Sequence, residues 1–360
     1  MKHLTYNQAS YIFVRCLIPK IMPNIKDVAK AAGVSIATVS YVLNNKSAFY
    51  SEKTRQLVLE AVERVGYTPN VTARNLKANQ TRLIGYACHH LPPGQFNSVL
   101  DQFVYFLTQE AEAAGYHILM FTFPLDNPPS AYDDLIRTGQ VDAFVVASTN
   151  LNDSRIRFLL DQQFPFVSFG RANSEWDFPY VDTDGERGIC EAVKYLYSLG
   201  HERIAMIGWP EESISGSFRV AGYLRAHHEL GLPLRSEYLL RAEHSEQAGR
   251  AALAEWLSLP RSKWPTAVVA IDDLVAIGVM NEASERGLPV GEGFAVVGYD
   301  DMPLGQYLRP SLTTMRQPIA AICRNLILML EDILNQRPLE NPCRLLPPEL
   351  VVRASSGGPL

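Results

Sequence analysis

Several polar side chains follow short apolar runs, at the places where the strands of a parallel sheet would end. Asp272 follows the run Val268–Ile271, and Asp300 comes near the end of the stretch Phe294–Asp301. The residues of this kind that we expect at a binding site are Arg171, Asp184, Ser215, Arg219, Asp272 and Asp300. Carboxylates accept hydrogen bonds from hydroxyl groups, arginine donates to them, and aromatic rings stack on C–H faces. Trp176 and Trp209 are rings of this type, so the set predicts a polyhydroxylated ligand.

Motifs of common catalytic and cofactor sites do not occur in the sequence. It has no G-x-x-x-x-G-K-[ST] phosphate loop, no G-x-S-x-G nucleophile elbow, no H-E-x-x-H, and no G-x-G-x-x-G after the first apolar run. The segment Cys88-His89-His90 suggests a metal site, but adjacent side chains in an extended chain point to opposite faces. We therefore expect no enzyme activity, no cofactor and no metal, although α/β domains host many chemistries.

The strands that would place the binding residues are short apolar runs separated by helical stretches. The runs are Leu83–Ala87, His117–Phe121, Ala143–Ala147, Phe166–Phe169, Ile204–Ile207, Ala267–Ala270 and Phe294–Val297. Apolar strands without alternation, joined by helices, are typical of parallel sheets covered on both faces. The pattern repeats, which predicts two Rossmann-like halves with a ligand cleft at the carboxyl ends of their strands. A long helix, Ile319–Asn335, and a final strand near Leu345–Val352 complete this α/β prediction.

Residues 24–69 contain three short helical patterns instead. The first runs from Ile25 to Ala32 and ends at Gly33, where a left-handed residue carries the least penalty. The second, Ile36–Leu43, is capped by Ser35, and the third begins after Ser51. Two short helices joined by a glycine-containing turn are typical of a helix-turn-helix, whose second helix enters the major groove of DNA.

Charge divides the chain at the same place. Between residues 24 and 80, eight Lys and Arg residues face four Asp and Glu, whereas residues 81–360 carry 22 Lys and Arg against 34 Asp and Glu. A basic segment on an acidic body is expected for a phosphate-binding module joined to a domain that does not touch DNA. With 47% hydrophobic and 20% charged residues over 360 positions, the chain is neither disordered nor fibrous in composition.

Nothing in the sequence predicts a membrane span or an oxidising compartment. The five cysteines are scattered and form no C-x-x-C pair. The apolar run Tyr11–Ile18 is divided by Arg15, and no small-residue cleavage site follows it. We expect a cytoplasmic protein. Residues 1–23 are expected to be an N-terminal extension, either a disordered arm or the product of a misassigned start codon.

Two stretches carry a specific resemblance to a known family. Asn24–Asn44 reads NIKDVAKAAGVSIATVSYVLN, and Gly66–Lys77 reads GYTPNVTARNLK. Both resemble the headpiece and hinge of the lac repressor and purine repressor (LacI/GalR) family of bacterial transcription regulators, and the resemblance covers about residues 24–353. It implies a DNA-binding headpiece at 24–69, a hinge helix and linker at 70–81, and a type I periplasmic-binding-protein-like effector and dimerisation domain at 82–360.

The resemblance also implies which residues touch double-stranded operator DNA. They are Ser35, Ile36, Ala37, Thr38, Ser40, Tyr41, Asn44, Arg74, Leu76 and Lys77. Ile36, Ala37 and Tyr41 would face base edges, and Leu76 would insert as a wedge into the central minor-groove step. Simple packing is the alternative for Ile36, Ala37 and Leu76. Family members often have arginine where Tyr41 stands, and tyrosine cannot bind guanine in a bidentate manner, so the operator sequence stays open.

In the body, the resemblance implies effector contacts from Arg219, Asp272 and Asp300. Asp272 replaces a common asparagine, and His244 stands where an aromatic stacking residue is common. The complete effector-binding prediction is Arg171, Trp176, Asp184, Ser215, Arg219, His244, Asp272 and Asp300. The alternatives are a helix N-cap for Asp300 and a rim or surface position for Trp176.

These patterns predict a ligand-controlled, sequence-specific DNA-binding repressor whose effector is a sugar, namely a di- or oligosaccharide. The alternatives are a nucleobase-responsive regulator of the same family, and a solute-binding protein or sugar-processing enzyme without DNA function. No heptad tail follows Arg353, which favours a homodimer over a tetramer. The expected N-subdomain comprises about 82–181 and 312–340, and the expected C-subdomain about 182–311 and 341–354. The sequence does not encode whether the ligand weakens or strengthens DNA binding.

Overall fold

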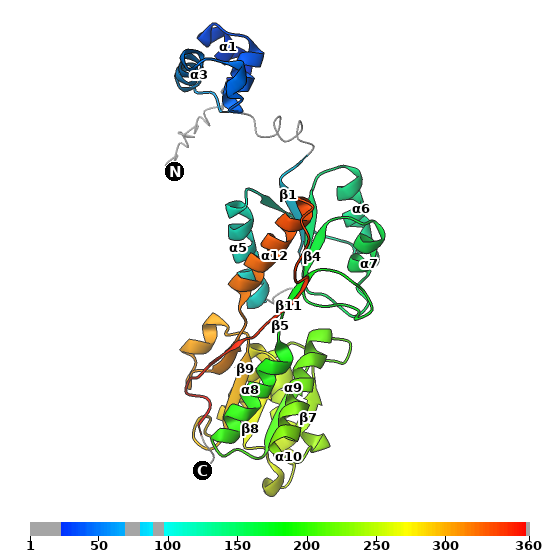
Figure 1. Ribbon diagram of the computed structural model, residues 1–360. Coiled ribbons are helices and arrows are strands. Elements are labelled where there is room, and N and C mark those ends of the chain that lie inside the picture. The colour runs from blue at the N-terminus through cyan, green and yellow to red at the C-terminus, as the bar shows by residue number, and fades with distance from the viewer. Residues whose placement is uncertain (1–22, 69–79, 89–96, 358–360) are drawn as a thin grey trace, which may run out of the picture. The chain divides into compact units, whose positions relative to one another are not determined.

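The computed structural model describes residues 23–68, 80–88 and 97–357. It divides into two compact units, with the boundary between Asn79 and Gln80. The first unit contains a small helical headpiece, and the second contains two α/β subdomains (Figure 1). None of the helices in these described ranges is long and apolar enough to cross a bilayer.

The headpiece is built from short helices with well-defined caps. Its helices are α1 (Ile25–Ala32), α2 (Ile36–Leu43), η1 (Ser47–Phe49) and α3 (Glu52–Val65). Asn24 begins α1 with a capping box that includes Asp27, and Gly33 ends it at φ +66°. The buried residues that hold these helices together are Val28, Ala29, Val39, Val42, Val58 and Ala61. The predicted helix-turn-helix and the bounds predicted for its two helices are therefore confirmed.

The first subdomain of the body is a six-stranded parallel sheet in the order β11-β5-β4-β3-β1-β2. Its strands are β1 (Leu83–Ala87), β2 (His117–Phe121), β3 (Ala143–Val146), β4 (Phe166–Phe169), β5 (Tyr180–Thr183) and β11 (Cys343–Leu346). Two helices cover each face of the sheet (Figure 1). They are α5 (Ser98–Ala113) with α12 (Ile319–Leu334), and α6 (Pro129–Arg137) with α7 (Ser154–Asp161).

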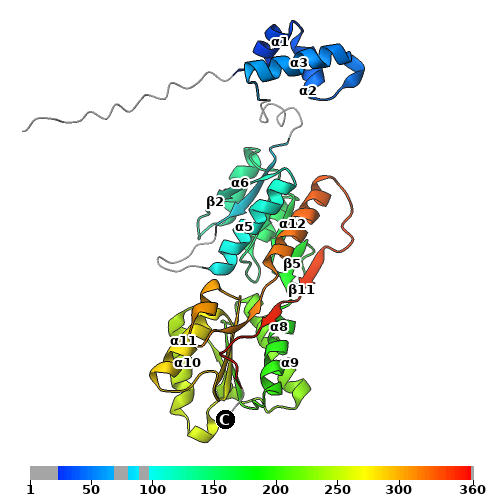
Figure 2. The ribbon, with the colours of Figure 1, turned by 90° about the vertical axis from the view of Figure 1, so that its left-hand side faces the viewer.

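The second subdomain contains a six-stranded sheet in the order β12-β10-β9-β8-β6-β7, in which β12 alone runs antiparallel to its neighbour. Its strands are β6 (Ile204–Gly208), β7 (Leu239–Arg241), β8 (Ala267–Ala270), β9 (Ala295–Tyr299), β10 (Thr313–Arg316) and β12 (Glu349–Val351). Helices α8 and α9 cover one face, and α10 and α11 cover the other (Figure 2). Their bounds are α8 (Gly185–Ser198), α9 (Ile214–Leu230), α10 (Glu246–Ser258) and α11 (Asp273–Glu285), and short 3₁₀ turns are η2 (Ser236–Tyr238), η3 (Arg261–Lys263) and η4 (Pro303–Tyr307).

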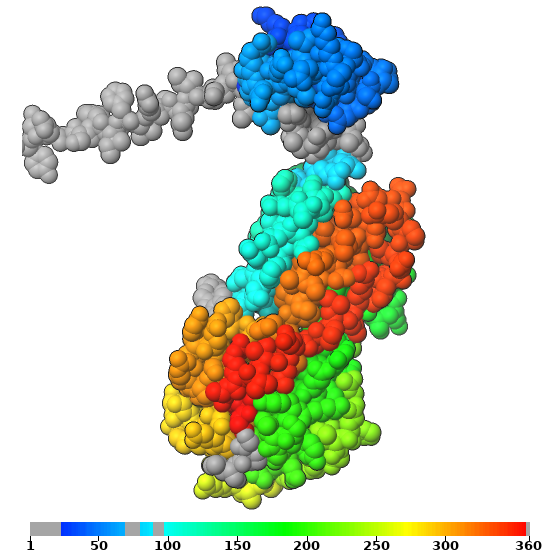
Figure 3. All heavy atoms as spheres, turned by 60° about the vertical axis from the view of Figure 1, so that its left-hand side comes forward, coloured from blue at the N-terminus to red at the C-terminus, as the bar shows by residue number. Residues whose placement is uncertain are grey.

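Within residues 97–357 the chain passes between the two sheets three times: after β5, after β10, and between β11 and β12. Figure 3 shows the last of these segments, in red, running along one face from the first subdomain to the second. The boundaries expected from the sequence differ here, because they placed β10 (within 312–340) in the N-subdomain and β11 (within 341–354) in the C-subdomain. Strand β10 pairs with β9, and β11 pairs with β5. An apolar run does not reveal which sheet it joins, so only the pairing decides this.

The single final strand expected near Leu345–Val352 is two strands. Pro347 and Pro348 separate β11 from β12, and proline lacks the N–H that a sheet ladder needs. The break lets β11 complete the first sheet and β12 complete the second. The residues after β12 stay in the second subdomain, where the Ser355 hydroxyl donates to the Val296 carbonyl.

Helices α10 and α11 approach closely where Gly249 of α10 faces Gly278 of α11. A Cβ on Gly249 would clash with the backbone carbonyl of Val275 and the backbone N–H of Val279. We therefore expect Gly249→Ala to lower the free energy of unfolding by about 3 kcal/mol, as measured by urea denaturation. The control is Ala251→Ser, which adds one heavy atom to the exposed face of the same helix and should stay within about 0.5 kcal/mol of wild type. Equal stability of Gly249→Ala and wild type would show that the helices separate at little cost.

Candidate effector cavity and DNA-binding surface

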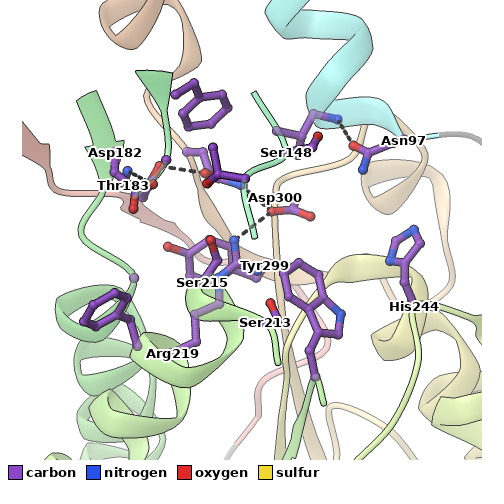
Figure 4. A pocket seen from close by; sticks show the side chains of 18 of the residues that line it. Asn97, Ser148, Asp182, Thr183, Ser213, Ser215, Arg219, His244, Tyr299 and Asp300 are labelled. Carbon is purple, nitrogen blue, oxygen red and sulfur yellow. Dashed lines mark hydrogen bonds and ion pairs between the residues drawn. The ribbon is translucent and has the colours of Figure 1, made fainter. Parts of the chain in front are cut away.

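A cavity of about 610 Å³ lies between the two subdomains, at the carboxyl ends of their strands (Figure 4). Its polar lining residues are Asn97, Ser148, Thr149, Asn150, Arg171, Asp182, Thr183, Ser213, Ser215, Arg219, Glu243, His244, Ser245, Asp300 and Gln317. Its aromatic lining residues are Phe169, Trp209, Phe218 and Tyr299. Five of the eight predicted effector residues line this one cavity: Arg171, Ser215, Arg219, His244 and Asp300.

Arg171, in the loop after β4, is fixed from two sides. Its Nε donates to Asp182 Oδ2 at 2.8 Å, and its guanidinium lies 3.4 Å from the ring centre of Phe218. Burial raises the pKa of Asp182, and the charge of Arg171 opposes that rise. Because Asp182 comes from the first subdomain and Phe218 from α9 of the second, Arg171 connects the two halves of the cleft.

Arg219, on α9, is a buried residue of the cavity wall. It is 5% exposed, and its guanidinium lies 3.7 Å from the ring centre of Tyr299 and 4.9 Å from that of Trp209. One NH group donates to the backbone carbonyl of Ile271, and another is 3.7 Å from Asp300 Oδ1. Such a guanidinium is held in one orientation, with its edge toward the carboxylate.

Asp300 lies at the centre of the polar wall, directly after β9. Its backbone has φ +110°, an unusual conformation for a residue with a side chain, and it caps no helix. Gln317 Nε2 donates to Asp300 Oδ1 at 2.7 Å, and Thr183 Oγ1 donates to Gln317 Oε1 at 2.6 Å. Burial raises the pKa of Asp300 to about 6, and the negative charge of Asp272 raises it as well. The positive charge of Arg219 lowers this pKa and so opposes the shift.

Three predicted effector residues are not in the cavity wall. Asp184 caps the N-terminus of α8 by accepting from the Arg187 backbone N–H. Asp272 is fully buried and caps α11, while its Oδ2 accepts from Trp209 Nε1 and His244 Nδ1, each at 2.9 Å. Trp176 lines a different cavity. A carboxylate after a strand satisfies helix N–H groups as readily as it binds a ligand, which explains both misplaced aspartates.

Sequence reasoning missed several lining residues for an identifiable reason. Asp182 and Thr183 end β5, and Gln317 follows β10, but neither strand was among the predicted apolar runs. Ser148 stands two residues after the end of β3, so the same strand-end rule would have selected it. Polar strands such as β5, which reads YVDT, give a weak apolar signal although their positions are buried.

The predicted recognition helix α2 presents a partly exposed surface. Ile36 is 45% exposed, and Ala37 is exposed beside it. Ser35 caps the helix by accepting from the Thr38 backbone N–H, and the two side-chain hydroxyls lie 2.9 Å apart. The first turn of α2 therefore offers small apolar and hydroxyl groups, with no acidic residue, to a partner.

The far end of α2 is held by contacts within the headpiece. Tyr41 stacks on Phe49 with 4.7 Å between ring centres, and Asn44 Nδ2 donates to the Ser40 backbone carbonyl at 2.7 Å. The hydroxyl is the only hydrogen-bonding group of a tyrosine side chain, so the predicted contact of Tyr41 with DNA would have to be made by that group. The predicted contacts of Arg74, Leu76 and Lys77 lie outside the described residues.

No cluster of three or more histidine, cysteine or acidic residues that could hold a metal ion occurs within residues 23–68, 80–88 and 97–357. Of the Cys88-His89-His90 segment, only Cys88 lies within them.

A helix-turn-helix headpiece followed by two parallel-sheet subdomains around a ligand-sized cleft defines a class: a DNA-binding regulator with a periplasmic-binding-protein-like effector domain. Residues 24–70 match the family model described as bacterial regulatory proteins, lacI family, and residues 193–356 match the periplasmic binding protein-like domain.

Relatives match over nearly the whole chain. The HTH-type transcriptional repressor CytR of Escherichia coli (strain K12) is 32% identical over 334 residues, which cover 92% of this chain and 96% of CytR. The HTH-type transcriptional repressor PurR of Aliivibrio fischeri (strain MJ11) is 31% identical over 341 residues, which cover 93% of this chain and 98% of PurR. The chain therefore belongs to the lacI family of bacterial regulatory proteins. It is a DNA-binding transcriptional regulator and not an enzyme.

Solved structures of regulators agree with this fold. A lacI-family regulatory protein from Chloroflexus aggregans is 45% identical with a TM-score of 0.73, covering 77% of this chain and 99% of that one. The lac repressor dimer bound to operator and an anti-inducer is 25% identical with a TM-score of 0.79, covering 93% and 99%. The regulator CelR in complex with cellobiose is 27% identical with a TM-score of 0.70, covering 92% and 99%.

Proposed function

We propose that this protein is a repressor that binds operator DNA as a homodimer. Its affinity for DNA falls or rises when a sugar, namely a di- or oligosaccharide, binds in the cleft. Its relatives CytR and PurR are named as repressors, and the lac repressor structure is a dimer on operator DNA. The basic, helix-turn-helix headpiece supports binding to DNA phosphates and base edges.

The observation that carries the sugar assignment is the pairing of each cavity arginine with a carboxylate. Arg171 contacts Asp182 at 2.8 Å, and Arg219 approaches Asp300 to 3.7 Å. Because each arginine is already paired with a carboxylate, neither is left to neutralise an anionic ligand. Glu243 adds a further negative charge to the cavity wall. A neutral ligand with many hydroxyl groups satisfies such a surface, because it both donates to carboxylates and accepts from guanidinium N–H groups.

The aromatic walls support the same class of ligand. Trp209, which donates to Asp272, and Phe218, on which Arg171 stacks, both line the cavity. Flat apolar faces of a sugar ring pack against such rings while the hydroxyls at the ring edge reach polar groups. The solved complex of the related regulator CelR contains cellobiose, a disaccharide, and its fold matches this chain closely.

A short chain of hydrogen bonds joins Asp300 in the cavity wall to the segments that connect the two subdomains. Asp300 accepts from Gln317, which accepts from Thr183, and these last two residues stand on two of the segments that link the subdomains. A ligand that closes the cleft therefore acts where the subdomains are joined. The resulting change in DNA affinity cannot exceed the difference in ligand affinity between the two states, typically about 1–3 kcal/mol.

A screen of the full-length protein tests the proposal. Cellobiose, maltose and lactose are compared with adenine, guanine, hypoxanthine and cytidine by thermal shift, and each ligand that binds is added to a complex with operator DNA selected from random sequence. We expect stabilisation by at least one sugar and a change in operator affinity of at least about fivefold. Stabilisation by nucleobases or the nucleoside alone would replace the sugar with a nucleobase effector. No effect of any bound ligand on operator affinity would refute control of DNA binding.

Effector affinity is expected to fall as the pH drops below about 6. The pKa of Asp300 is about 6 because the carboxyl is buried, and hydrogen bonds from ligand hydroxyls favour its ionised form. Below pH 6 the empty site holds a proton that ligand binding must release, which lowers affinity at pH 5 by roughly tenfold relative to pH 7. Calorimetry between pH 5 and pH 8 measures the profile. Asp300→Asn should flatten it; an unchanged profile in that variant would assign the titration to another group.

A further inference from the structure

A second cavity, of about 690 Å³, borders the effector cavity. Loop residues after β4, including Asn173 and Trp176, line it from the first subdomain, and Glu211 and Ile214 line it from the second. Arg171 and Phe218 line both cavities. The stacked Arg171–Phe218 pair is therefore a partition with a binding cavity on each side.

Trp176 differs from the other tryptophans of the chain. Trp209, Trp256 and Trp264 each donate their indole N–H to an oxygen of the protein: Asp272 Oδ2, the Glu237 carbonyl and the Leu259 carbonyl, respectively. The indole N–H of Trp176 has no acceptor among the described residues, although the ring is half-buried and lines the second cavity. The guanidinium of Arg157 lies over the Trp176 ring, 5.9 Å from its centre. A ring that lines a cavity and whose N–H is unused by the described residues is suited to a ligand with apolar faces and hydroxyl acceptors.

The charges around the second cavity select a neutral ligand. Glu175, Asp177 and Glu211 line it and are exposed to solvent, and Glu211 lies 3.6 Å from Arg241, which does not line the cavity. Arg171 is the one cationic residue among those that line the cavity, and it is already paired with Asp182. Phosphate or carboxylate groups would be repelled by this excess of negative charge. Hydroxyl groups would find acceptors in the carboxylates and in the amide of Asn173.

We propose that the two cavities form one extended site for a linear neutral oligosaccharide of at least three sugar units, a proposal that rests on the sugar effector above. The first units occupy the effector cavity, beside Arg219 and Asp300. The chain then crosses the Arg171–Phe218 pair, and the next unit stacks on Trp176, whose N–H donates to a sugar oxygen. The preferred effector is thus longer than the disaccharide that the effector cavity holds.

Calorimetry on the full-length protein tests this with two series of probes: cellobiose, cellotriose and cellotetraose, and maltose, maltotriose and maltotetraose. In the series that binds, we expect the tetrasaccharide to bind at least about tenfold more tightly than the disaccharide. Trp176→Ala should remove this difference and leave disaccharide affinity unchanged. Glu211→Gln, at a side chain that is 81% exposed, should reduce tetrasaccharide affinity about threefold without endangering the fold.

Tyr197→Ala is the control, because Tyr197 is a surface aromatic residue on α8 that lines neither cavity. Its affinities for the short and the long probe should equal those of wild type. Disaccharide binding with no gain from added units, or equal losses for both lengths in Trp176→Ala, would overturn the extended site and leave the sugar-responsive repressor intact. Absence of binding by all six sugars, with binding of a nucleobase, would overturn the sugar effector itself.

Discussion

Replacing Arg219 with alanine is expected to lower effector affinity by at least about 100-fold and the free energy of unfolding by about 3–5 kcal/mol. The guanidinium is 5% exposed and approaches Asp300 Oδ1 to 3.7 Å. Its removal leaves a buried carboxylate without its nearest positive charge and an empty space beside Tyr299. The pKa of Asp300, already raised by burial, should rise further, because Arg219 is the main group that opposes the shift.

Urea denaturation and calorimetry at pH 7 measure the two effects of Arg219→Ala. The matched control is Arg225→Ala on the same helix, because Arg225 is 40% exposed and pairs with Glu186 and Glu229 at the surface. Surface ion pairs contribute at most about 1 kcal/mol, so this variant should keep nearly full stability and affinity. Arg219→Lys should recover part of the stability but little affinity, since lysine lacks the planar fork. Normal effector affinity in Arg219→Ala would show that the guanidinium supports the fold alone.

Replacing Ala37 with glutamate is expected to reduce affinity for operator DNA by at least about 100-fold. Ala37 is exposed on the first turn of α2, the helix that enters the major groove in a helix-turn-helix. A carboxylate there would be buried against phosphates and base edges, where a like-charge contact costs several kcal/mol. The headpiece itself should keep its stability, because α2 has no acidic residue in its first turn and a negative charge there favours the helix dipole.

Fluorescence anisotropy with labelled operator DNA, at a stated salt concentration, measures the effect of Ala37→Glu. Leu57→Glu adds the same charge to an exposed position of α3 and serves as the control. It should reduce affinity by only a few-fold, through the change in overall charge. Effector binding should remain at the wild-type level in both variants, because the cavity lies in the other compact unit. Equal losses in the two variants would contradict a specific role for α2.

The headpiece shows how far local sequence signals reach. Ser35 and Ser51 cap α2 and α3, and Gly33 ends α1, where the sequence pattern places these residues. Each cap depends on hydrogen bonds within three or four residues, so the sequence alone specifies it. The same holds for the strongly apolar strands β1, β2, β4 and β8, whose predicted bounds agree with the structure.

Only part of the candidate effector site could be predicted from the sequence. The strand-end rule located Arg171 and Asp300, because parallel strands bring their carboxyl ends to one edge. Arg219 lies on α9, and its effector contact was implied by the family resemblance. The strand-end rule could not separate Asp300, which faces the cavity, from Asp272, which lies behind it and holds Trp209 and His244. Both are aspartates after a buried strand, and the difference between them arises from the direction of each side chain in the packed structure.

The amino-acid sequence by itself therefore determined the helices of the headpiece, the α/β character of the body, and the division into a basic segment and an acidic body. Propensity, capping and charge act locally, so the sequence is enough to specify these features. The tertiary structure alone decided which sheet β10 and β11 join, and it alone brought Asp182 and Gln317 to Arg171 and Asp300. These contacts join residues 11 to 17 positions apart, or strands more than 100 positions apart in the case of β11 and β5. Hydrogen bonding between distant strands and burial of polar groups against each other depend on the whole packed chain, and no local pattern records them.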